Sequence, residues 1–130
     1  MEKKAHYTLG KKDRLKSRKT IEHLFKEGKS FSIFPFRVIY SVENRVENIL
    51  QAGFGASTRN FKKAVDRNRI KRLMREAYRL QKEVLNNQNL AVFFIYTGKE
   101  IPDYKLVSEK ILLCIKRLQK IINEKRIENT

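Results

Sequence analysis

Several residue types are scarce in this sequence, and their scarcity narrows the classes of protein that it can represent. Cys114 is the only cysteine, which excludes a disulfide framework and a cysteine-based zinc cluster. No stretch approaches the ~18 apolar residues of a membrane-spanning helix, and the first residues lack the apolar core of a secretory signal. His6 and His23 have no carboxylate or second histidine at ligand spacing, so we interpret both as surface residues. We therefore expect a cytoplasmic protein and assign no metal ligand in it.

Acidic residues are also few, with 14 Asp and Glu against 30 Lys and Arg, and the formal net charge is +16. A domain with this much charge repels itself, so a polyanionic partner is the natural explanation. Nucleic acid, an anionic membrane surface and an acidic protein are the candidates. The sequence has no paired carboxylates, no nucleophile beside a base and no glycine-rich phosphate loop. We therefore predict no catalytic residue in the protein itself.

The spacing of apolar residues predicts an α+β domain. Helical spacing follows Ser17, a suitable N-cap, and stops at Gly28, which suits a left-handed C-terminal residue. Alternating residues then predict strands, and the continuous apolar run "LAVFFIYTG" predicts a central strand covered on both faces. The expected helices are 18–27, a second from 62 or 65 to 86, and a third after a cap at Asp103. The expected strands are 30–33, 36–43, the stretch "NILQAGFGAS", and "LAVFFIYTG".

We divide the chain into a basic mobile arm at 1–16, a single domain at 17–125 and a frayed tail at 126–130. The last helix carries a single apolar stripe that includes Cys114, so we expect a buried thiol rather than a reactive one. The stripe consists of Val107, Ile111, Cys114, Leu118 and Ile121 or Ile122.

The stretch "DRNRIKRLMREAYR", residues 66–79, combines a dense positive charge with helical spacing. Its apolar arc should pack on the sheet and offset the repulsion among the charges, leaving a wet basic face on the other side. The apolar arc comprises Ile70, Leu73, Met74, Ala77, Leu80, Gln81 and Val84. The basic face comprises Asn68, Lys71, Arg72, Arg75 and Arg79, flanked by Arg67 and Arg69, and extended upstream by Arg59, Lys62 and Lys63.

An arginine-rich face favours nucleic acid, because the planar guanidinium pairs with phosphate oxygens through two hydrogen bonds and also stacks on bases. A membrane-surface helix would carry bulky aromatic residues on its apolar stripe, and this stripe is aliphatic. The residues themselves leave DNA and RNA open, because no helix-turn-helix, zinc finger, ribonucleoprotein signature or KH loop is recognisable. Phe25, Phe36 and Tyr40 are either an aromatic platform for a single strand or part of the core.

Four stretches together resemble one family. "AVDRNRIKRLMREAYR" closely resembles the signature of the protein subunit of bacterial ribonuclease P, whose core reads R-N-R-x-K-R-x-x-R. "RLKSRKTIEHLFKEGKSF" is similar to the first helix of that family, "FRVIY" to its aromatic-bearing strand and "LAVFFIYTG" to its buried strand. The resemblance covers roughly residues 12 to 120.

The resemblance implies a four-stranded sheet packed with three helices, with a left-handed crossover helix between central strands. Periodicity alone would favour the right-handed crossover found in about 98% of cases. The implied activity is endonucleolytic removal of the 5′ leader from precursor tRNA. In that scheme a catalytic RNA subunit performs the chemistry with Mg²⁺, and the protein binds that RNA and the precursor tRNA.

By the same resemblance, the signature residues face the catalytic RNA: Arg67, Asn68, Arg69, Lys71, Arg72 and Arg75. A cleft between the first helix and the sheet takes the leader, which makes Phe25, Phe36 and Tyr40 its candidates. A shift of one residue in the alignment would exchange Tyr40 with Ile39. The sequence departs from the family where two lysines are common, because Ser57, Thr58 and Arg59 stand there.

Two other functions remain as alternatives. A structural RNA-binding protein of the ribosomal type would sediment with ribosomes and would not stimulate cleavage. A non-specific DNA-compacting protein would bind duplex DNA and structured RNA about equally.

Overall fold

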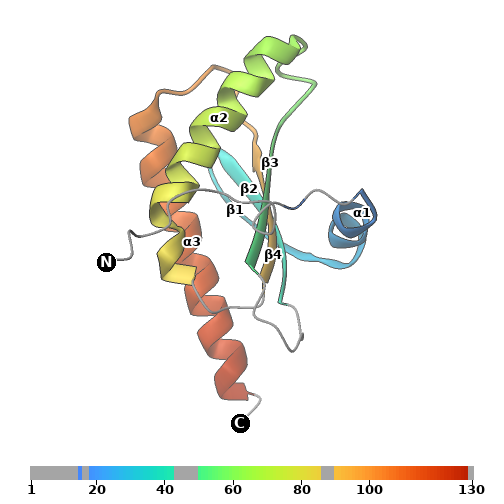
Figure 1. Cartoon of the computed structure of the whole chain (residues 1–130), viewed down its shortest axis with the longest axis vertical. Coiled ribbons are helices and arrows are strands. Elements are labelled where there is room, and N and C mark those ends of the chain that lie inside the picture. The colour runs from blue at the N-terminus through green and yellow to red at the C-terminus, as the bar shows by residue number, and fades with distance from the viewer. Residues whose placement is uncertain (1–14, 16–17, 43–49, 86–89, 129–130) are drawn as a thin grey trace, which may run out of the picture.

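The structure, a computed structural model, describes residues 15, 18–42, 50–85 and 90–128 (Figure 1). The elements lie close to the ranges expected from the sequence. In chain order they are α1 (Arg18–Glu27), β1 (Lys29–Ile33), β2 (Phe36–Val42), β3 (Leu50–Ala56), α2 (Ala64–Gln81), the 3₁₀ helix η2 (Lys82–Leu85), β4 (Leu90–Tyr96) and α3 (Tyr104–Glu128).

The four strands form one mixed sheet in the order β1-β2-β4-β3. β1 pairs antiparallel with β2, β2 pairs antiparallel with β4, and β3 pairs parallel with β4. The predicted α+β class, with a four-stranded sheet and three helices, is confirmed. β4 is central as expected. β3, however, lies at the edge, so α2 crosses from an edge strand to a central one and not between two central strands. The left hand of that crossover stays a prediction.

The helices divide between the two faces of the sheet (Figure 1). α2 and α3 cover one face, where alternate strand residues such as Val38, Val92 and Phe94 join the main core. α1 lies on the other face, where Leu24 packs with Ile39 of β2 and Ala91 of β4 in a smaller cluster. Both clusters follow from the period of two along each strand, which sends neighbouring side chains to opposite faces.

α1 ends where predicted, but Gly28 is not left-handed, because no described glycine has a positive φ. Space explains the glycine instead. A Cβ at Gly28 would lie 2.4 Å from the carbonyl oxygen of Leu24 and 3.0 Å from that of Tyr40. The Gly28 N–H also donates to Leu24 O at 2.8 Å, which closes the last turn of the helix. The helix therefore meets the sheet too closely for a side chain.

α3 begins with the predicted cap, since the Leu106 N–H donates to Asp103 Oδ1 at 2.8 Å. Its predicted apolar stripe is confirmed, and Cys114 is fully buried within it. Burial raises the pKa of the Cys114 thiol to about 12, so the thiol stays protonated at neutral pH. The helix continues to Glu128, so residues 126–128 of the predicted tail are helical, and the fraying stays a prediction.

Leu15 corrects the prediction of a mobile arm at 1–16. Its side chain is buried in the α1-side cluster, and its N–H donates to the carbonyl oxygen of Ala52 in β3 at 3.0 Å. Because β3 is an edge strand, its outer carbonyl oxygens are available to such a segment. The rest of the arm, the Ser17 cap and residues 129–130 lie outside the described residues.

Candidate nucleic-acid interface

The basic helix α2 is attached to the body through Ile70, Met74, Ala77 and Tyr78, which are all buried. The buried side of α2 is rotated by part of a turn from the predicted apolar arc. Tyr78, which the prediction left out, is buried, whereas Leu80, which it included, is 44% exposed. Neighbouring rings account for the difference. Tyr78 packs with its centroid 5.6 Å from those of both Phe54 and Phe94, so an aromatic cluster under the helix sets its rotation.

The opposite side of α2 carries the predicted basic face. The side chains of Asn68, Arg69, Arg72 and Arg75 are exposed, and Lys71 is half-buried. Exposed positive charges continue into the turn before the helix, at Arg59, Lys62 and Lys63. The structure therefore brings the predicted RNA-binding residues onto one helix and the turn that leads into it. A surface of this kind can engage several phosphates at once.

Arg67 has a structural role that the sequence did not reveal. Its Nη1 donates to the carbonyl oxygens of Phe61 and Lys62, both at 2.8 Å. The guanidinium thereby ties the turn that carries Lys62 and Lys63 to the first turn of α2. Hydrogen bonds from a charged donor are among the stronger hydrogen bonds in proteins. Arg67 thus holds the basic turn in position, and part of its hydrogen-bonding capacity is already used.

Arg79, at the far end of α2, pairs with Glu76 through its Nε, at 3.2 Å from Oε2, and through its Nη2. The hydrogen bond from Arg79 lowers the pKa of the Glu76 carboxyl, so Glu76 is ionised at neutral pH. Glu76 is exposed, and its charge offsets that of Arg79. The positive surface is consequently strongest at the N-terminal half of the helix.

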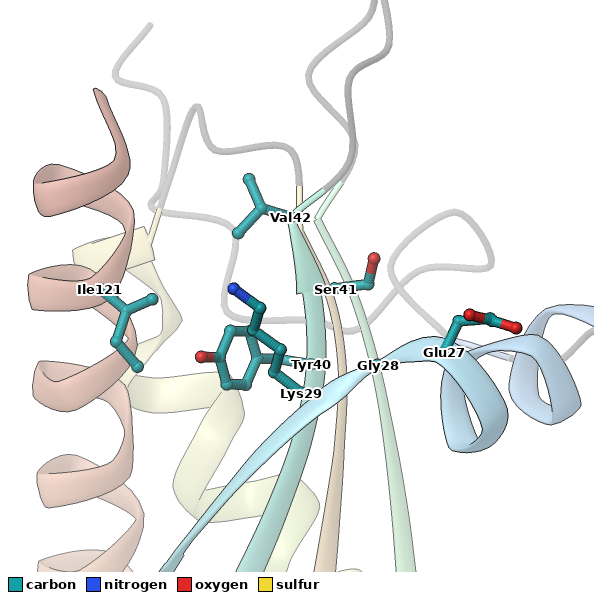
Figure 2. A pocket seen from close by; sticks show the side chains of 7 residues that line it. All are labelled: Glu27, Gly28, Lys29, Tyr40, Ser41, Val42 and Ile121. Carbon is teal, nitrogen blue, oxygen red and sulfur yellow. The ribbon is translucent and has the colours of Figure 1, made fainter. Parts of the chain in front are cut away.

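The structure corrects two of the three aromatic residues predicted for the leader cleft. Phe36 and Tyr40 belong to the main core under α2 and α3, on the face of the sheet opposite α1. Figure 2 shows the Tyr40 ring directed toward Ile121 of α3, whereas Glu27 of α1 lies beyond the other face of β2. The ring also lies 5.9 Å from that of Phe31. Phe36 therefore lies away from a ligand bound beside α1, and Tyr40 approaches α1 only at its last residue, Glu27, with which it lines a hollow.

Tyr40 lines a hollow of about 180 Å³, whose other lining residues are Glu27, Gly28, Lys29, Ser41, Val42 and Ile121 (Figure 2). This hollow lies at the edge of the core and does not reach the basic face of α2. On β2 it is Ile39, and not Tyr40, that packs with Leu24 of α1.

The surface that does lie beside α1 contains Phe25, Phe93 and Ile39, with the exposed Arg37 on the same face of β2. The rings of Phe25 and Phe93 meet edge to face, with their centroids 5.2 Å apart. Phe25 is 48% exposed and Phe93 is half-buried, while Ile39 lies beneath them with 5% exposure. We call Phe25, Arg37, Ile39 and Phe93 the α1 surface. It combines an open aromatic pair with a cation.

Phe93 was not among the predicted site residues, because the run "LAVFFIYTG" was interpreted as strand core. A signal was nevertheless present in "AGFGA". The glycines of that stretch alternate along β3, and Gly53 is the neighbour of Phe93 across the parallel pair. The Phe93 ring occupies the space that side chains at Gly53 and Gly55 would otherwise fill.

Two negative findings apply to the described part of the chain. No helix in it is both long enough and apolar enough to cross a membrane. The described residues also contain no group of three or more His, Cys, Asp or Glu side chains arranged to hold a metal ion.

Comparison with known proteins gives a consistent result. The model of the family described as Ribonuclease P matches residues 9–119. The Ribonuclease P protein component of Porphyromonas gingivalis is 34% identical over 95% of this chain and 95% of its own length. The protein of the same name from Chlorobium phaeobacteroides is 32% identical over 80% of this chain and 83% of its own length.

Solved structures agree in fold. The RNase P protein from Thermotoga maritima superposes with a TM-score of 0.67 at 30% identity, covering 80% of this chain and 96% of that one. The Staphylococcus aureus RNase P protein gives a TM-score of 0.69 at 20% identity, over 82% of this chain and 94% of that one. The second match supports the fold alone.

Proposed function

This chain belongs to the family of bacterial ribonuclease P protein components, and from that premise we propose that it assists its RNA subunit through two separate surfaces. Ribonuclease P is a ribonucleoprotein endoribonuclease of tRNA processing whose RNA is the catalyst, and this chain is its protein subunit. In our proposal the basic face of α2 binds the catalytic RNA, and the α1 surface binds the 5′ leader of precursor tRNA.

The binding of catalytic RNA is assigned to the residues predicted from the sequence. Support comes from the exposure of most of these side chains, along one side of α2 and in the turn before it, and from the few acidic side chains among them. The residues are Arg59, Lys62, Lys63, Arg67, Asn68, Arg69, Lys71, Arg72, Arg75 and Arg79. Within this set, Arg67 acts partly by positioning the turn of Lys62 and Lys63, and Arg79 is partly neutralised by Glu76.

The leader is assigned to the α1 surface in place of the trio predicted from the sequence. Of that trio, Phe25 is kept. Phe36 and Tyr40 are replaced by Arg37, Ile39 and Phe93. The exposed part of the Phe25–Phe93 pair offers a platform on which an unpaired base can stack, and Arg37 offers a cation to its phosphate. Stacking is tolerant of sequence, which suits leaders that differ from one precursor to another.

The contribution of such a protein to catalysis is electrostatic and positional. Catalytic RNA and precursor tRNA repel each other, and a domain of net charge +16 placed between them weakens that repulsion. Because mature tRNA lacks the leader, contacts with the leader raise the affinity for the precursor substrate but not for the product. We assign the chemistry and its Mg²⁺ to the RNA subunit, since a surface this positive repels a divalent cation. The expected cytoplasmic location stays a prediction.

The observation that carries the two-surface proposal is the location of the exposed Phe25–Phe93 pair on the face of the sheet opposite α2. The test compares precursor and mature tRNA for affinity to the reconstituted holoenzyme. Phe25→Ala should lower affinity for precursor about tenfold while leaving mature tRNA and RNA-subunit binding unchanged. Leu113→Ala is the control, because Leu113 is 45% exposed but lies on α3. Equal losses for precursor and mature tRNA would contradict the leader assignment.

A further inference from the structure

A second open hollow, of about 440 Å³, lies at the end of the sheet where the β1–β2 turn meets the segment between β4 and α3. Apolar side chains of Phe34, Pro35, Tyr96 and Leu106 form much of its lining, and Lys99 and Lys110 stand with them. Its size is within the range of about 300–1,000 Å³ that is usual for small-ligand sites. The hollow touches neither the basic face of α2 nor the α1 surface.

Phe34 is the unusual member of this hollow. It is 77% exposed and belongs to neither core cluster, so it contributes little to folding. A phenylalanine exposed at the turn between β1 and β2, beside an apolar hollow, offers a surface on which another ring can stack.

The floor of the hollow is held by hydrogen bonds within the chain. The backbone N–H of Thr97 donates to Pro35 O at 2.8 Å, and its hydroxyl donates to the same oxygen at 3.0 Å. The Tyr96 hydroxyl donates to Glu100 O at 2.7 Å. The Thr97 bonds join the β1–β2 turn to the segment after β4, and the Tyr96 bond holds that segment in place, so the site is formed before any ligand arrives.

The hollow is also connected to the basic turn before α2. The Asn60 side-chain amide donates to the carbonyl oxygens of Thr97 and Gly98, both at 3.2 Å. Asn60 directly follows Arg59 and precedes Lys62, which the proposed function assigns to the RNA subunit. The basic turn therefore lies directly beside the hollow, because Thr97 and Gly98 belong to its lining.

The charges select the kind of ligand. Lys99 and Lys110 contribute two positive charges to the lining, and Glu100 contributes one negative charge, within a chain of net charge +16. From the exposed ring, the two lysines and the connection through Asn60, we infer that this hollow binds one unstacked nucleotide of the catalytic RNA. The base stacks on Phe34, and the adjoining phosphate pairs with Lys99 and Lys110. The inference rests on the proposed function, because it takes the RNA subunit as the partner.

Equilibrium binding of full-length variants to the cognate RNA subunit tests the stacking. Phe34→Ala and Phe34→Leu should each weaken binding about tenfold, whereas Phe34→Trp should bind as tightly as the wild type. The leucine variant separates stacking from simple apolar contact. Undiminished binding by Phe34→Leu would overturn the assignment of a base to this ring.

The salt dependence of the same binding tests the phosphate contact. Lys99→Ala/Lys110→Ala should reduce the slope of log affinity against log salt by about 0.7, which corresponds to one single-strand phosphate contact. Lys105→Ala/Lys116→Ala removes the same charge from exposed positions of α3 outside the lining and should change the slope less. Equal slopes for the two pairs would overturn the phosphate contact.

Two further outcomes are informative. If Phe34→Ala changes the oligomeric state of the free protein but not its RNA affinity, the hollow receives a second copy of the chain and the inference is wrong. If the wild type binds and stimulates the RNA subunit while every variant at the hollow matches it, this inference fails and the proposed function stands. If the wild type itself fails to bind the RNA, the proposed function fails first.

Discussion

The ring of Phe93 rests directly on the backbone of Gly53, and a Cβ at Gly53 would lie only 2.6 Å from Phe93 Cδ2. The relationship connects the edge strand to the surface beside α1, because Phe93 also meets Phe25 edge to face. An absent side chain on β3 thus decides where an aromatic ring on β4 can lie.

Gly53→Ala should displace Phe93 and lower stability by about 1–3 kcal/mol, the usual range for adding a methyl group to a packed site. Urea unfolding measures the stability, and the ratio of precursor to mature tRNA affinity measures the effect on the α1 surface. Both should fall. Gly55→Ala is the matched control, since its Cβ would lie 3.0 Å from Phe93 Cε1 and needs a smaller adjustment. Identical behaviour of the two variants would refute the seating of Phe93 on Gly53.

Arg67→Ala should lower the free energy of unfolding by about 1–2 kcal/mol, because two carbonyl oxygens lose a charged donor. Arg69→Ala removes the same type of side chain from an exposed position of the same helix. Its free energy of unfolding should stay within about 0.5 kcal/mol of the wild-type value. Chemical unfolding of the two variants side by side provides the measurement. If Arg67→Ala lost no more stability than Arg69→Ala, the hydrogen bonds of Arg67 would not hold the turn before α2 in place.

Glu76→Gln should strengthen binding to the RNA subunit, because it releases Arg79 from a carboxylate. The affinity for the RNA subunit should rise a few-fold. If Arg79 then contacts a phosphate of an RNA duplex, the slope of log affinity against log salt should also become steeper by up to about 0.9. Since the pKa of Glu76 is lowered in the folded protein, the pair is present above the carboxyl's ordinary pKa. It is lost only as the pH falls through the lowered value. Weaker RNA binding by Glu76→Gln would contradict this account.

Cys114 gives stability a pH dependence in alkaline solution. Its pKa is raised from 9.0 to about 12, so the folded state keeps a proton that the unfolded state releases between these values. Stability is therefore complete below pH 9 and declines above it, by about 1.4 kcal/mol per pH unit from this group. Subtracting the unfolding free energies of Cys114→Ala from those of the wild type at pH 8 and pH 10 isolates the effect. A difference that does not change with pH would contradict it.

Patterns local in sequence predicted most of the fold. The tertiary structure keeps several local preferences of the sequence. Examples are the helical spacing of Ile21 and Leu24, the cap at Asp103 and the apolar run of β4. The edge position of β3 and the burial of Leu15 were not predictable in this way, because both depend on which strands pair across long stretches of chain.

The candidate site shows the same division. The basic face of α2 was predictable because charges on one side of a helix repeat at a known spacing. The α1 surface was not, since which face of β2 meets α1 depends on how the helix docks, and a shift of one residue exchanges Ile39 with Tyr40. Arg67 and Asn60 were beyond prediction in their roles, because their hydrogen bonds go to backbone oxygens that only the folded turns bring within reach.

The central claim, that the basic face of α2 makes this chain a working subunit of ribonuclease P, has one most direct test. The test measures precursor-tRNA cleavage by the cognate RNA subunit at low millimolar Mg²⁺, without protein, with the wild type and with two double variants. Arg69→Ala/Arg72→Ala removes charge from the basic face, and Lys116→Ala/Lys120→Ala removes the same charge from exposed positions on α3.

We expect strong stimulation by the wild type and by the α3 variant. The arginine variant should lose stimulation and regain activity when Mg²⁺ is raised, because added cations screen the same repulsion. Equal stimulation by both double variants, or none by the wild type, would contradict the account.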